Sequence, residues 1–372
     1  MNIGFDAKRA FLNSSGLGNY SRTLIKSLVN NFPSNHYSLF TTKKSKTDFN
    51  SFASAQKNIS TIQPKNFIDK KLNSRWRSYG ITKLLDENKI KIYHGLSNEL
   101  PFNISKFKGK KIVTIHDLIF LRHPELYPII DGKIYNKKFK SACELADVVV
   151  AISEQTKNDI IEFYSIPEKK IKVIYQSCNE VFYKQRSKDE TEKIKSKYHL
   201  PKNYLLSVGT IEERKNLLTI VKALTTTKDI PLVVIGKRKA YYKKVQKFIS
   251  ENKLEKRIFF PQNIPNEDLP AIYSGADIFI YPSLVEGFGI PIIEALTCKT
   301  PVISTKGGCF SEAGGAHSIY IDPTNDVQLA DEIQKLLSST DKRKEISEKG
   351  FEHSKMFLPE VIASDIIKLY SE

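Results

Sequence analysis

Residues 277–296 read DIFIYPSLVEGFGIPIIEAL, in which a strand pattern runs through a glycine turn into a helix pattern. Apolar residues precede Gly287 and Gly289, and helically spaced apolar residues follow them. A helix that begins directly after a strand presents its free backbone N–H groups at the strand end, and glycine allows a ligand to approach that backbone closely. Pro291 fits the first helical turn, where no N–H is needed. Because the N-terminal end of a helix favours negative charge, the stretch predicts an anion site, such as one for phosphate.

The alternation of apolar runs with amphipathic stretches continues on both sides of this segment. It predicts parallel sheets with helices on both faces, that is, an α/β protein. The charged, weakly periodic residues 175–204 are interpreted as the connection between two Rossmann-like, doubly wound domains that face a central cleft. We expect an N-terminal domain over residues 1–180, a C-terminal domain over residues 181–356 and a final helix within 357–372. Strands are expected within residues 1–7, 36–42, 91–96, 110–117, 146–153, 203–210, 230–237, 256–262, 276–283, 300–306 and 317–323.

Length and composition support two globular domains. The chain has 372 residues, which is long for a single hydrophobic core. No run of 18 apolar residues occurs and the first residues lack the apolar core of a signal peptide, so we expect a cytoplasmic protein. The four cysteines form no CxxC pair and are expected to be reduced and mostly buried.

The net charge of +17 is concentrated in the first half of the chain. Residues 1–180 contain 29 Lys and Arg against 16 Asp and Glu, a balance of +13, which leaves +4 for the remainder. Such an excess indicates a surface that meets an anionic partner, namely nucleic acid, phospholipid or a phosphorylated acceptor. A lysine-rich composition that only solvates the protein is an equally open interpretation.

Two carboxylates flank the glycine turn of the opening segment. Glu286 stands just before the turn, and Glu294 lies about one turn into the following helix. One acid could bind the hydroxyls of a sugar while the other holds a ribose. A glycine-rich turn beside two solvated acids is the alternative, and on the sequence alone both stay open.

A second cluster of candidate residues lies in SVGTIEERKNLLTI, residues 207–220. The expected strand ends at Gly209, and Arg214 and Lys215 precede the next helix pattern. Cations in this place would neutralise a diphosphate and stabilise it as a leaving group. The alternative is a solvated charge cluster at a turn, although its position after the second domain's first strand favours function.

The N-terminal half offers weaker signals. Gly16 and Gly18, in NSSGLGNYSRTL, follow the first strand like a phosphate loop, but a third glycine and a Walker lysine are missing. His116 lies at the carboxyl end of an expected strand, where ligand residues gather, and His94 and Ser97 are similarly placed. For a lone histidine the usual alternative is a hydrogen-bonded interior residue.

Several signatures are missing from the chain. No HExxH, CxxC or DxD-like triplet is present, so no metal site is predicted. Neither GxSxG nor a known nucleic-acid-binding signature occurs.

Taken together and in order, these stretches resemble the retaining GT-B glycosyltransferases of the large family 4, the glycosyl transferases group 1. The most specific element is the pair of acids with seven residues between them, Glu286 and Glu294. The resemblance implies that Glu286 contacts the donor sugar, that Glu294 contacts the ribose, and that Arg214 and Lys215 in the segment that begins near Gly209 hold the diphosphate.

The same resemblance implies further contacts. The backbone N–H groups of Phe288 and Gly289 would meet phosphate, and Gly16 and Gly18 would close over it from the opposite domain. His116 would meet the sugar near the reacting carbon, and the final helix would cross back onto the N-terminal domain. By the same resemblance, the N-terminal domain would bind the acceptor and the C-terminal domain the nucleotide sugar. The chain departs from its relatives at two places: Thr210 stands where many carry arginine, and Ser311 where proline is common.

The resemblance implies transfer of a hexose from a nucleoside diphosphate sugar to a hydroxyl of a glycan or lipid-linked acceptor, with no metal or added cofactor. The segment GTIEERKN is similar to that of bacterial mannosyltransferases of polysaccharide and lipopolysaccharide assembly, which favours GDP-mannose, with UDP-sugars next. Two alternatives are a nucleotide-sugar epimerase of the same fold and, from the charge alone, a nucleic-acid-binding protein.

A membrane contact is a further possibility. The segment KNFIDKKLNSRWRSYG, residues 65–80, mixes basic and apolar residues and is compatible with an interfacial helix on an anionic membrane. Its apolar residues could equally pack inside the domain.

Overall fold

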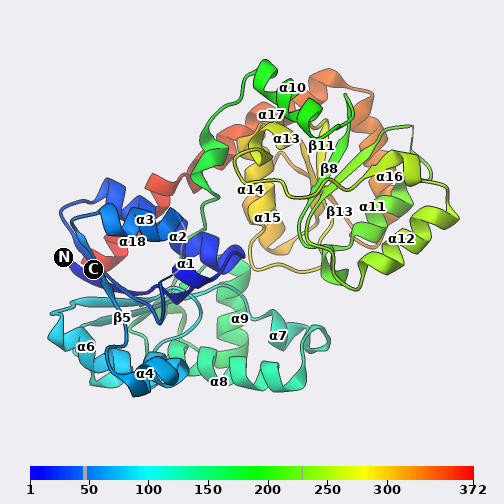
Figure 1. The fold of residues 1–372 in the computed structure, drawn as a ribbon. Coiled ribbons are helices and arrows are strands. Elements are labelled where there is room, and N and C mark those ends of the chain that lie inside the picture. The colour runs from blue at the N-terminus through cyan, green and yellow to red at the C-terminus, as the bar shows by residue number, and fades with distance from the viewer. Residues whose placement is uncertain (45–47, 228) are drawn as a thin grey trace. The chain divides into compact units, whose positions relative to one another are not determined.

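A computed structural model of the chain describes residues 1–44, 48–227 and 229–372. These residues form two units, Met1–Ser177 with Leu358–Glu372, and Cys178–Phe357 (Figure 1). The sequence had placed the division after residue 180 and the start of the last segment at residue 357.

The first unit is built on a parallel sheet with the strand order β3-β2-β1-β4-β5-β6-β7. The order reverses direction between β1 and β4, which makes this pair the topological switch point. The strands are short and mostly buried, as expected when helices cover both faces of a parallel sheet. They are β1 (Asn2–Asp6), β2 (His36–Phe40), β3 (Ile59–Ile62), β4 (Ile92–Gly95), β5 (Lys110–Ile115), β6 (Val148–Ala151) and β7 (Ile171–Val173).

Helices of the first unit connect these strands. Tyr20, Leu24 and Leu28 lie on the buried face of α2, which explains the amphipathic pattern of that segment. The helices are α1 (Lys8–Leu12), α2 (Gly16–Asn31), α3 (Asp48–Ala55), α4 (Phe67–Lys71), α5 (Asn73–Arg75), the π-helix η1 (Trp76–Gly80), α6 (Ile81–Glu87), α7 (Ile119–Arg122), α8 (Ile129–Leu145) and α9 (Glu154–Tyr164), with 3-10 turns at Ile104–Lys106, Pro124–Leu126 and Glu168–Lys170.

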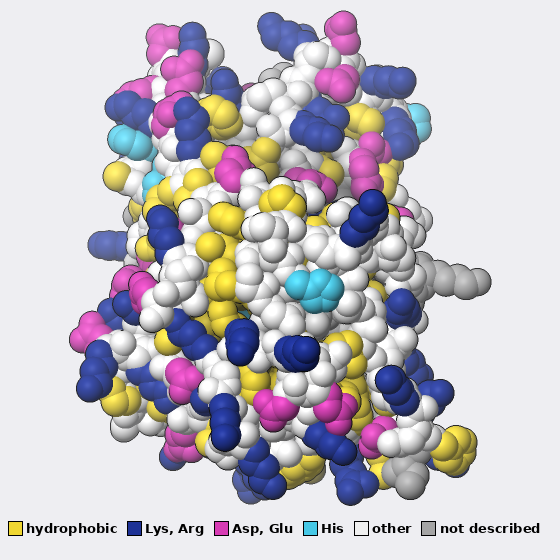
Figure 2. All heavy atoms as spheres, turned by 90° about the vertical axis from the view of Figure 1, so that its left-hand side faces the viewer, with side chains coloured by type: hydrophobic (Ala, Val, Ile, Leu, Met, Phe, Trp, Pro, Cys, Tyr) yellow, Lys and Arg dark blue, Asp and Glu magenta, His cyan; other side chains and the backbone are white. Residues whose placement is uncertain are grey.

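The first unit also carries most of the positive charge. Its sequence segments contain 30 Lys and Arg against 18 Asp and Glu, a balance of +12 of the total of +17. On the face shown in Figure 2, basic side chains lie scattered with acidic side chains among them, and they do not merge into one basic patch.

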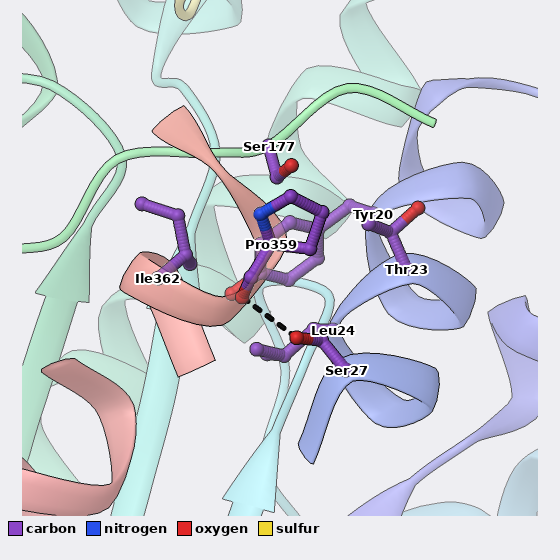
Figure 3. A pocket seen from close by; sticks show the side chains of 7 residues that line it. All are labelled: Tyr20, Thr23, Leu24, Ser27, Ser177, Pro359 and Ile362. Atoms are coloured by element: carbon purple, nitrogen blue, oxygen red, sulfur yellow. Dashed lines mark hydrogen bonds between the residues drawn. The ribbon is translucent and has the colours of Figure 1, made fainter. Parts of the chain in front are cut away.

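The last helix, α18 (Pro359–Ser371), belongs to the first unit and packs against α2. The hydroxyl of Ser27 on α2 donates a hydrogen bond of 2.7 Å to the carbonyl of Pro359 at the start of α18, beside a small hollow (Figure 3). Farther along α18, the apolar side chains of Ile362, Ile366 and Leu369 are buried in the same core as those of α2. The two ends of the chain therefore share one hydrophobic core.

The second unit has a parallel sheet in the order β10-β9-β8-β11-β12-β13, with its switch point between β8 and β11. Its strands are β8 (Leu205–Val208), β9 (Leu232–Ile235), β10 (Ile258–Phe259), β11 (Ile278–Tyr281), β12 (Val302–Thr305) and β13 (Ile319–Ile321). Its helices are α10 (Lys188–Lys197), α11 (Leu217–Ala223), α12 (Tyr242–Glu251), α13 (Leu269–Ser274), α14 (Ile290–Thr297), α15 (Gly308–Gly314), α16 (Asp326–Leu337) and α17 (Thr340–Ser354), with 3-10 turns at Glu180–Tyr183, Glu213–Lys215, Glu255–Arg257 and Lys355–Phe357.

Two doubly wound parallel sheets confirm the predicted α/β class. The interpretation of residues 175–204 as a mere connection was wrong in part, because α10 lies within them and packs against α13. Ser187 and Glu190 close a capping box at the start of α10, which is a local signal that hydrophobic periodicity alone does not reveal. The four cysteines form no disulfide and are buried, as predicted.

No helix within the described ranges is long and apolar enough to cross a membrane.

Candidate active site

Two glycines shape the end of β8, the strand at the switch point of the second unit. Gly209 has a φ of +150°, a backbone conformation that residues with side chains rarely adopt. A Cβ atom on Gly236, which follows β9, would lie 1.7 Å from the carbonyl oxygen of Gly209. Glycine at both positions therefore lets the two strand ends approach each other, beside a hollow that Gly209, Lys215 and Tyr281 help to line.

The turn that carries Arg214 and Lys215 is fixed to the segment after β11. Asn216 ends this turn with a φ of +56°, and its side-chain amide donates hydrogen bonds to the carbonyls of Pro282 at 3.1 Å and Pro323 at 2.6 Å. The backbone N–H of Leu284 donates to the carbonyl of Arg214 at 2.7 Å. These bonds hold both cations beside the residues that precede the glycine turn.

Glu286 is the centre of a nearly buried polar cluster and is only 8% exposed. Its Oε2 atom accepts a hydrogen bond of 2.7 Å from Nη1 of Arg214. Its Oε1 atom accepts from Nζ of Lys215 at 2.5 Å, from the hydroxyl of Ser283 at 2.5 Å and from the hydroxyl of Tyr281 at 3.0 Å. The structure thus brings three predicted site residues into direct contact.

The charges of this cluster stabilise one another. Burial on its own would raise the pKa of Glu286, but Lys215, Arg214 and the hydrogen bonds outweigh it and lower the pKa to about 2. Burial lowers the pKa of Lys215 and Arg214 lowers it further, against the opposing charge of Glu286. Glu286 is therefore an ionised hydrogen-bond acceptor at neutral pH, and it cannot act there as a proton donor.

The cluster as a whole has an excess of positive charge. Glu212 pairs with Arg214 at 2.8 Å and also with Lys239. Together with Lys215 and Glu286, these residues comprise three cations and two carboxylates. The excess charge is contributed by Lys239, whose side chain is 58% exposed and does not line the hollow at Gly209.

Helix α14 follows the glycine turn as the sequence predicts. Gly289 caps it with a φ of +113°, and Pro291 lies in its first turn. Glu294 lies farther along α14, where its Oε2 atom accepts a hydrogen bond of 2.8 Å from the hydroxyl of Tyr273. Burial raises the pKa of Glu294 to about 7, so the two predicted acids have opposite environments. Among the described residues, Glu294 makes no ion pair with Arg214 or Lys215.

His116 belongs to the first unit and lies at the end of β5. Its Nε2–H donates to the carbonyl of Leu96 at 2.9 Å, and its Nδ1 accepts from the side-chain amide of Gln176 at 2.9 Å. Its ring meets Tyr20 edge-on, with 4.7 Å between centroids. Burial lowers the pKa of His116 to about 4, so the imidazole is neutral and both of its nitrogens are occupied. Its contact with a sugar stays a prediction.

The two glycines of the predicted phosphate loop differ. Gly16 is the first residue of α2, and a Cβ atom there would meet nothing within 4 Å. A Cβ atom on Gly18 would lie 1.9 Å from the carbonyl oxygen of Asn13. Gly18 is therefore required by packing within the first unit, whereas Gly16 leaves its backbone open to approach.

Sequence reasoning missed several partners in this site. It gave no role to Tyr281 or Ser283, although both stand at the carboxyl end of an expected strand, where ligand residues gather. It also missed Asn216, whose left-handed backbone conformation is typical of asparagine at a turn. No sequence signal distinguishes Glu212 from its neighbour Glu213, because only the fold brings it to Arg214.

Comparisons with known proteins identify the family of the chain. The family described as "Glycosyltransferase Family 4" matches residues 14–179, and the one described as "Glycosyl transferases group 1" matches residues 188–353. The chain is 27% identical over 292 residues to the O-antigen chain mannosyltransferase B of Escherichia coli, covering 77% of this chain and 75% of that protein. It is also 27% identical to the O-antigen chain mannosyltransferase RfbU of Salmonella typhimurium, over 58% of this chain and 57% of that protein.

Solved structures show the same fold. The crystal structure of HepE from Anabaena in complex with UDP and glucose covers 100% of this chain, and 99% of HepE is covered in turn, with a TM-score of 0.77 at 17% identity. Sucrose-phosphate synthase from Thermosynechococcus elongatus gives a TM-score of 0.79 at 20% identity, with coverage of 100% and 98%. The two consecutive family matches, the mannosyltransferase relatives and these folds lead to one conclusion: the chain belongs to the group 1, family 4 glycosyltransferases and has the GT-B fold.

Proposed function

We propose that this glycosyltransferase moves a hexose from a nucleoside diphosphate sugar to a hydroxyl of a glycan or lipid-linked acceptor in cell-surface polysaccharide synthesis. The observation that carries the proposal is the contact of Arg214 and Lys215 with Glu286 beside the hollow at Gly209. A fixed pair of cations at a strand end suits a diphosphate, and an ionised carboxylate suits the hydroxyls of a sugar.

In the proposed reaction, the bond between the anomeric carbon and a diphosphate oxygen breaks while the acceptor oxygen bonds to that carbon from the same face. The acceptor's proton passes to the departing diphosphate, and the configuration at the anomeric carbon is retained. Arg214 and Lys215 would stabilise the departing charge, so we propose that no metal or added cofactor is required. Glu286 already accepts hydrogen bonds at both oxygens, which supports a role as a hydroxyl acceptor and not as a nucleophile.

The remaining roles are proposed on the family pattern. Glu294 would hold the ribose, the backbone N–H groups of Phe288 and Gly289 would meet phosphate together with the strand end at Gly209, and Gly16 would approach the donor from the first unit. GDP-mannose is the favoured donor because the relatives named above are mannosyltransferases. UDP-sugars come next, since HepE was crystallised with UDP.

A donor panel tests the proposal directly. Thermal shifts with GDP-mannose and UDP-hexoses identify the nucleotide that the protein binds. A transfer assay with a mannoside acceptor is then run in the presence of a chelator. NMR of the product gives its anomeric configuration. We expect one nucleotide class to stabilise the protein and the chelator to have no effect. Conversion of a nucleotide sugar without acceptor would indicate an epimerase. Tight, salt-sensitive binding of nucleic acid without sugar transfer would favour a nucleic-acid-binding protein.

We further infer that the enzyme contacts an anionic bilayer peripherally through the start of α8. Ile129 and Ile130 are 77% and 73% exposed there, and Lys133 and Lys137 follow on the next turns. Adjacent exposed isoleucines beside lysines, in a unit with a balance of +12, suit a lipid surface with negative headgroups. In the predicted segment 65–80, Trp76 is buried, whereas Phe67, Leu72 and Tyr79 are 69%, 48% and 53% exposed, so this segment stays a second candidate for the membrane contact.

Vesicle sedimentation checks this contact. With phosphatidylglycerol vesicles we expect binding at low salt that weakens at high salt, because screening reduces attraction to the headgroups. The double substitution Ile129→Ser and Ile130→Ser should reduce binding severalfold, whereas Val327→Ser, at a residue that is 64% exposed in the second unit, should not. An unbound wild-type protein at low salt would contradict the inference.

A further inference from the structure

A second hollow lies in the first unit, outside the carboxyl ends of β1 and β4. Asp6 ends β1, and Glu99 and Phe102 lie in the loop that follows β4. Arg77 from the π-helix η1 and Lys138 from α8 complete the charged part of the wall. Because β1 and β4 form the switch point of this sheet, the hollow occupies the position where doubly wound domains bind ligands.

The charged wall is rigid and nearly buried. The guanidinium of Arg77 donates to Oδ2 of Asp6 through Nε at 2.9 Å and through Nη2 at 2.5 Å. Its Nη1 donates to Oε2 of Glu99 at 2.8 Å. Lys138 donates to the same oxygen of Glu99 at 3.3 Å from the outer side of the hollow. These contacts leave the guanidinium no freedom to turn away.

Glu99 presents an available acceptor to the hollow. Both cations bond to its Oε2 atom, and no described residue donates a hydrogen bond to Oε1. The side chain is 17% exposed, so Oε1 can be reached by a ligand.

The chemistry of the wall suits the hydroxyls of a polyol. Asp6 and Glu99 carry two negative charges and Arg77 and Lys138 two positive charges, so these four groups sum to zero. Lys8, whose charge interacts with Asp6, Arg77 and Glu99, adds one positive charge beside them. A carboxylate oxygen beside an ammonium group can accept from one hydroxyl and donate to a neighbouring one. Phe102 adds an apolar rim next to these groups, as is suitable for the C–H face of a sugar ring.

The hollow is small and admits a single hydroxyl group of a sugar. Its interior has room for about one water-sized molecule, about 10 Å³, so a sugar ring could not enter it whole. Tyr79 is 53% exposed, and its ring lies 5.8 Å from that of Phe102. The two aromatic rings extend the apolar rim outside the hollow, where the remainder of a sugar ring would lie.

The loop that carries Glu99 is held by Gly95 and by His116, of which the sequence analysis had named His116. A Cβ atom on Gly95 would lie 2.2 Å from the carbonyl oxygen of Glu99, so glycine is needed for this tight turn. His116 donates from Nε2 to Leu96 and from its backbone N–H to Oδ1 of Asn98 at 2.7 Å. The buried, neutral imidazole therefore acts as a positioning residue for this loop.

From these features we propose that Glu99, Lys138 and Phe102 form a binding subsite for a hydroxyl-bearing edge of the acceptor saccharide, with Arg77 and Asp6 fixing its wall. That the bound saccharide is the acceptor rests on the proposed function. The binding of a sugar to this hollow can nevertheless be measured without any transfer.

The test uses the full-length chain and methyl α-D-mannopyranoside as the probe. Saturation-transfer NMR without nucleotide should detect its binding, and Glu99→Gln, Lys138→Ala and Phe102→Ala should each weaken it about tenfold. In a transfer assay, the same variants should raise the KM for the acceptor about tenfold and leave the KM for the donor within about twofold. Lys138→Ala leaves the ion pair between Arg77 and Glu99 in place, so weaker binding in this variant cannot be attributed to misfolding.

Matched controls lie on the same helix. Lys140 and Glu144 form a surface pair of 4.0 Å on α8, so Lys140→Ala and Glu144→Gln repeat the same changes outside the hollow and should alter nothing. Transfer that proceeds with unchanged acceptor KM in the three variants overturns the subsite and leaves the proposed function intact. Sugar binding that the variants abolish, without transfer from any donor, overturns the function and leaves the subsite. No binding of the probe up to about 50 mM also overturns the subsite.

Discussion

Glu286 is ionised in a nearly buried position because two cations and two hydroxyls surround it. Glu286→Gln keeps the size of the side chain and removes its charge, which leaves Arg214 and Lys215 without their shared counter-charge. We expect the unfolding free energy to fall by about 1–3 kcal/mol and kcat/KM to fall at least about 100-fold. Urea unfolding and initial rates check this, with the exposed Glu267→Gln as the control. Unchanged turnover would remove Glu286 from the site.

Buried neutral histidines predict a pH dependence of stability. In the folded chain burial lowers the pKa of His116 to about 4, against 6.5 for a free histidine. Between these values the unfolded state binds more protons, so the stabilisation is full above pH 6.5 and is lost as the pH falls towards 4. From pH 7 to pH 5 this loss amounts to about 2 kcal/mol for His116.

The fluorescence of Trp76, the only tryptophan of the chain, measures unfolding of the first unit. His116→Gln should remove about 2 kcal/mol of the difference between pH 7 and pH 5. A His116→Gln variant with the wild-type pH profile would contradict the burial argument.

The sequence predicted which residue types meet in the site, but not which bonds they make. Glu286, Arg214 and Lys215 could be named because each lies next to an expected strand end and a glycine turn. Their mutual ion pairs could not, since residues 214 and 286 are brought together only by the pairing of β8 with β11. The cluster around Arg77 was invisible for the same reason, because Asp6, Arg77 and Glu99 come from three separate segments.

At the level of elements, the two glycines at the start of α2 have different roles: Gly18 is needed for packing, and Gly16 leaves space for a ligand. Gly18→Ala should lower the unfolding free energy by about 2 kcal/mol or more, because its Cβ atom would overlap the carbonyl of Asn13. Gly16→Ala should keep or slightly raise stability, since alanine favours a helix and the space is open. If Gly16 approaches the donor, the same variant should raise the donor KM. Thermal unfolding of the two variants checks their stability, and initial rates check the donor KM. A destabilised Gly16→Ala variant would contradict the open space at Gly16.

Elements with strong local signals were predictable from the sequence. The strand before residue 282 and the helix after Gly289 follow from a buried apolar run, a glycine turn and Pro291 in a first turn. Helix α10 was missed because its residues are mostly charged and only Thr191 and Lys195 are buried. Its position depends on packing against α13, which is a tertiary contact and leaves little periodicity in the sequence.

For the whole molecule, the last helix is required by the first unit. Deletion of residues 358–372 removes the buried side chains of Ile362, Ile366 and Leu369 from the core, and also the 2.7 Å hydrogen bond between Tyr370 and His94. Three such side chains are worth about 1.5–3 kcal/mol each, which is comparable with the total stability of a domain. We expect the first unit to unfold and the second to persist.

Hydrogen exchange resolves the two units in the shortened chain. Amides of residues 1–177 should lose protection, whereas those of residues 178–357 should keep it. Deletion of residues 371–372 alone, which are exposed, serves as the control and should change neither. Full protection of residues 1–177 after the longer deletion would show that α18 is dispensable.

The shared core of the two chain ends also sets an order of events on the ribosome. The segment that completes the first unit is synthesised only after the 180 residues of the second unit. At about 5–20 residues per second this delay lasts on the order of 10–40 s. During that interval the nascent N-terminal sheet would expose the apolar groove meant for the final helix, so newly made chains should depend on chaperones more than the mature enzyme does.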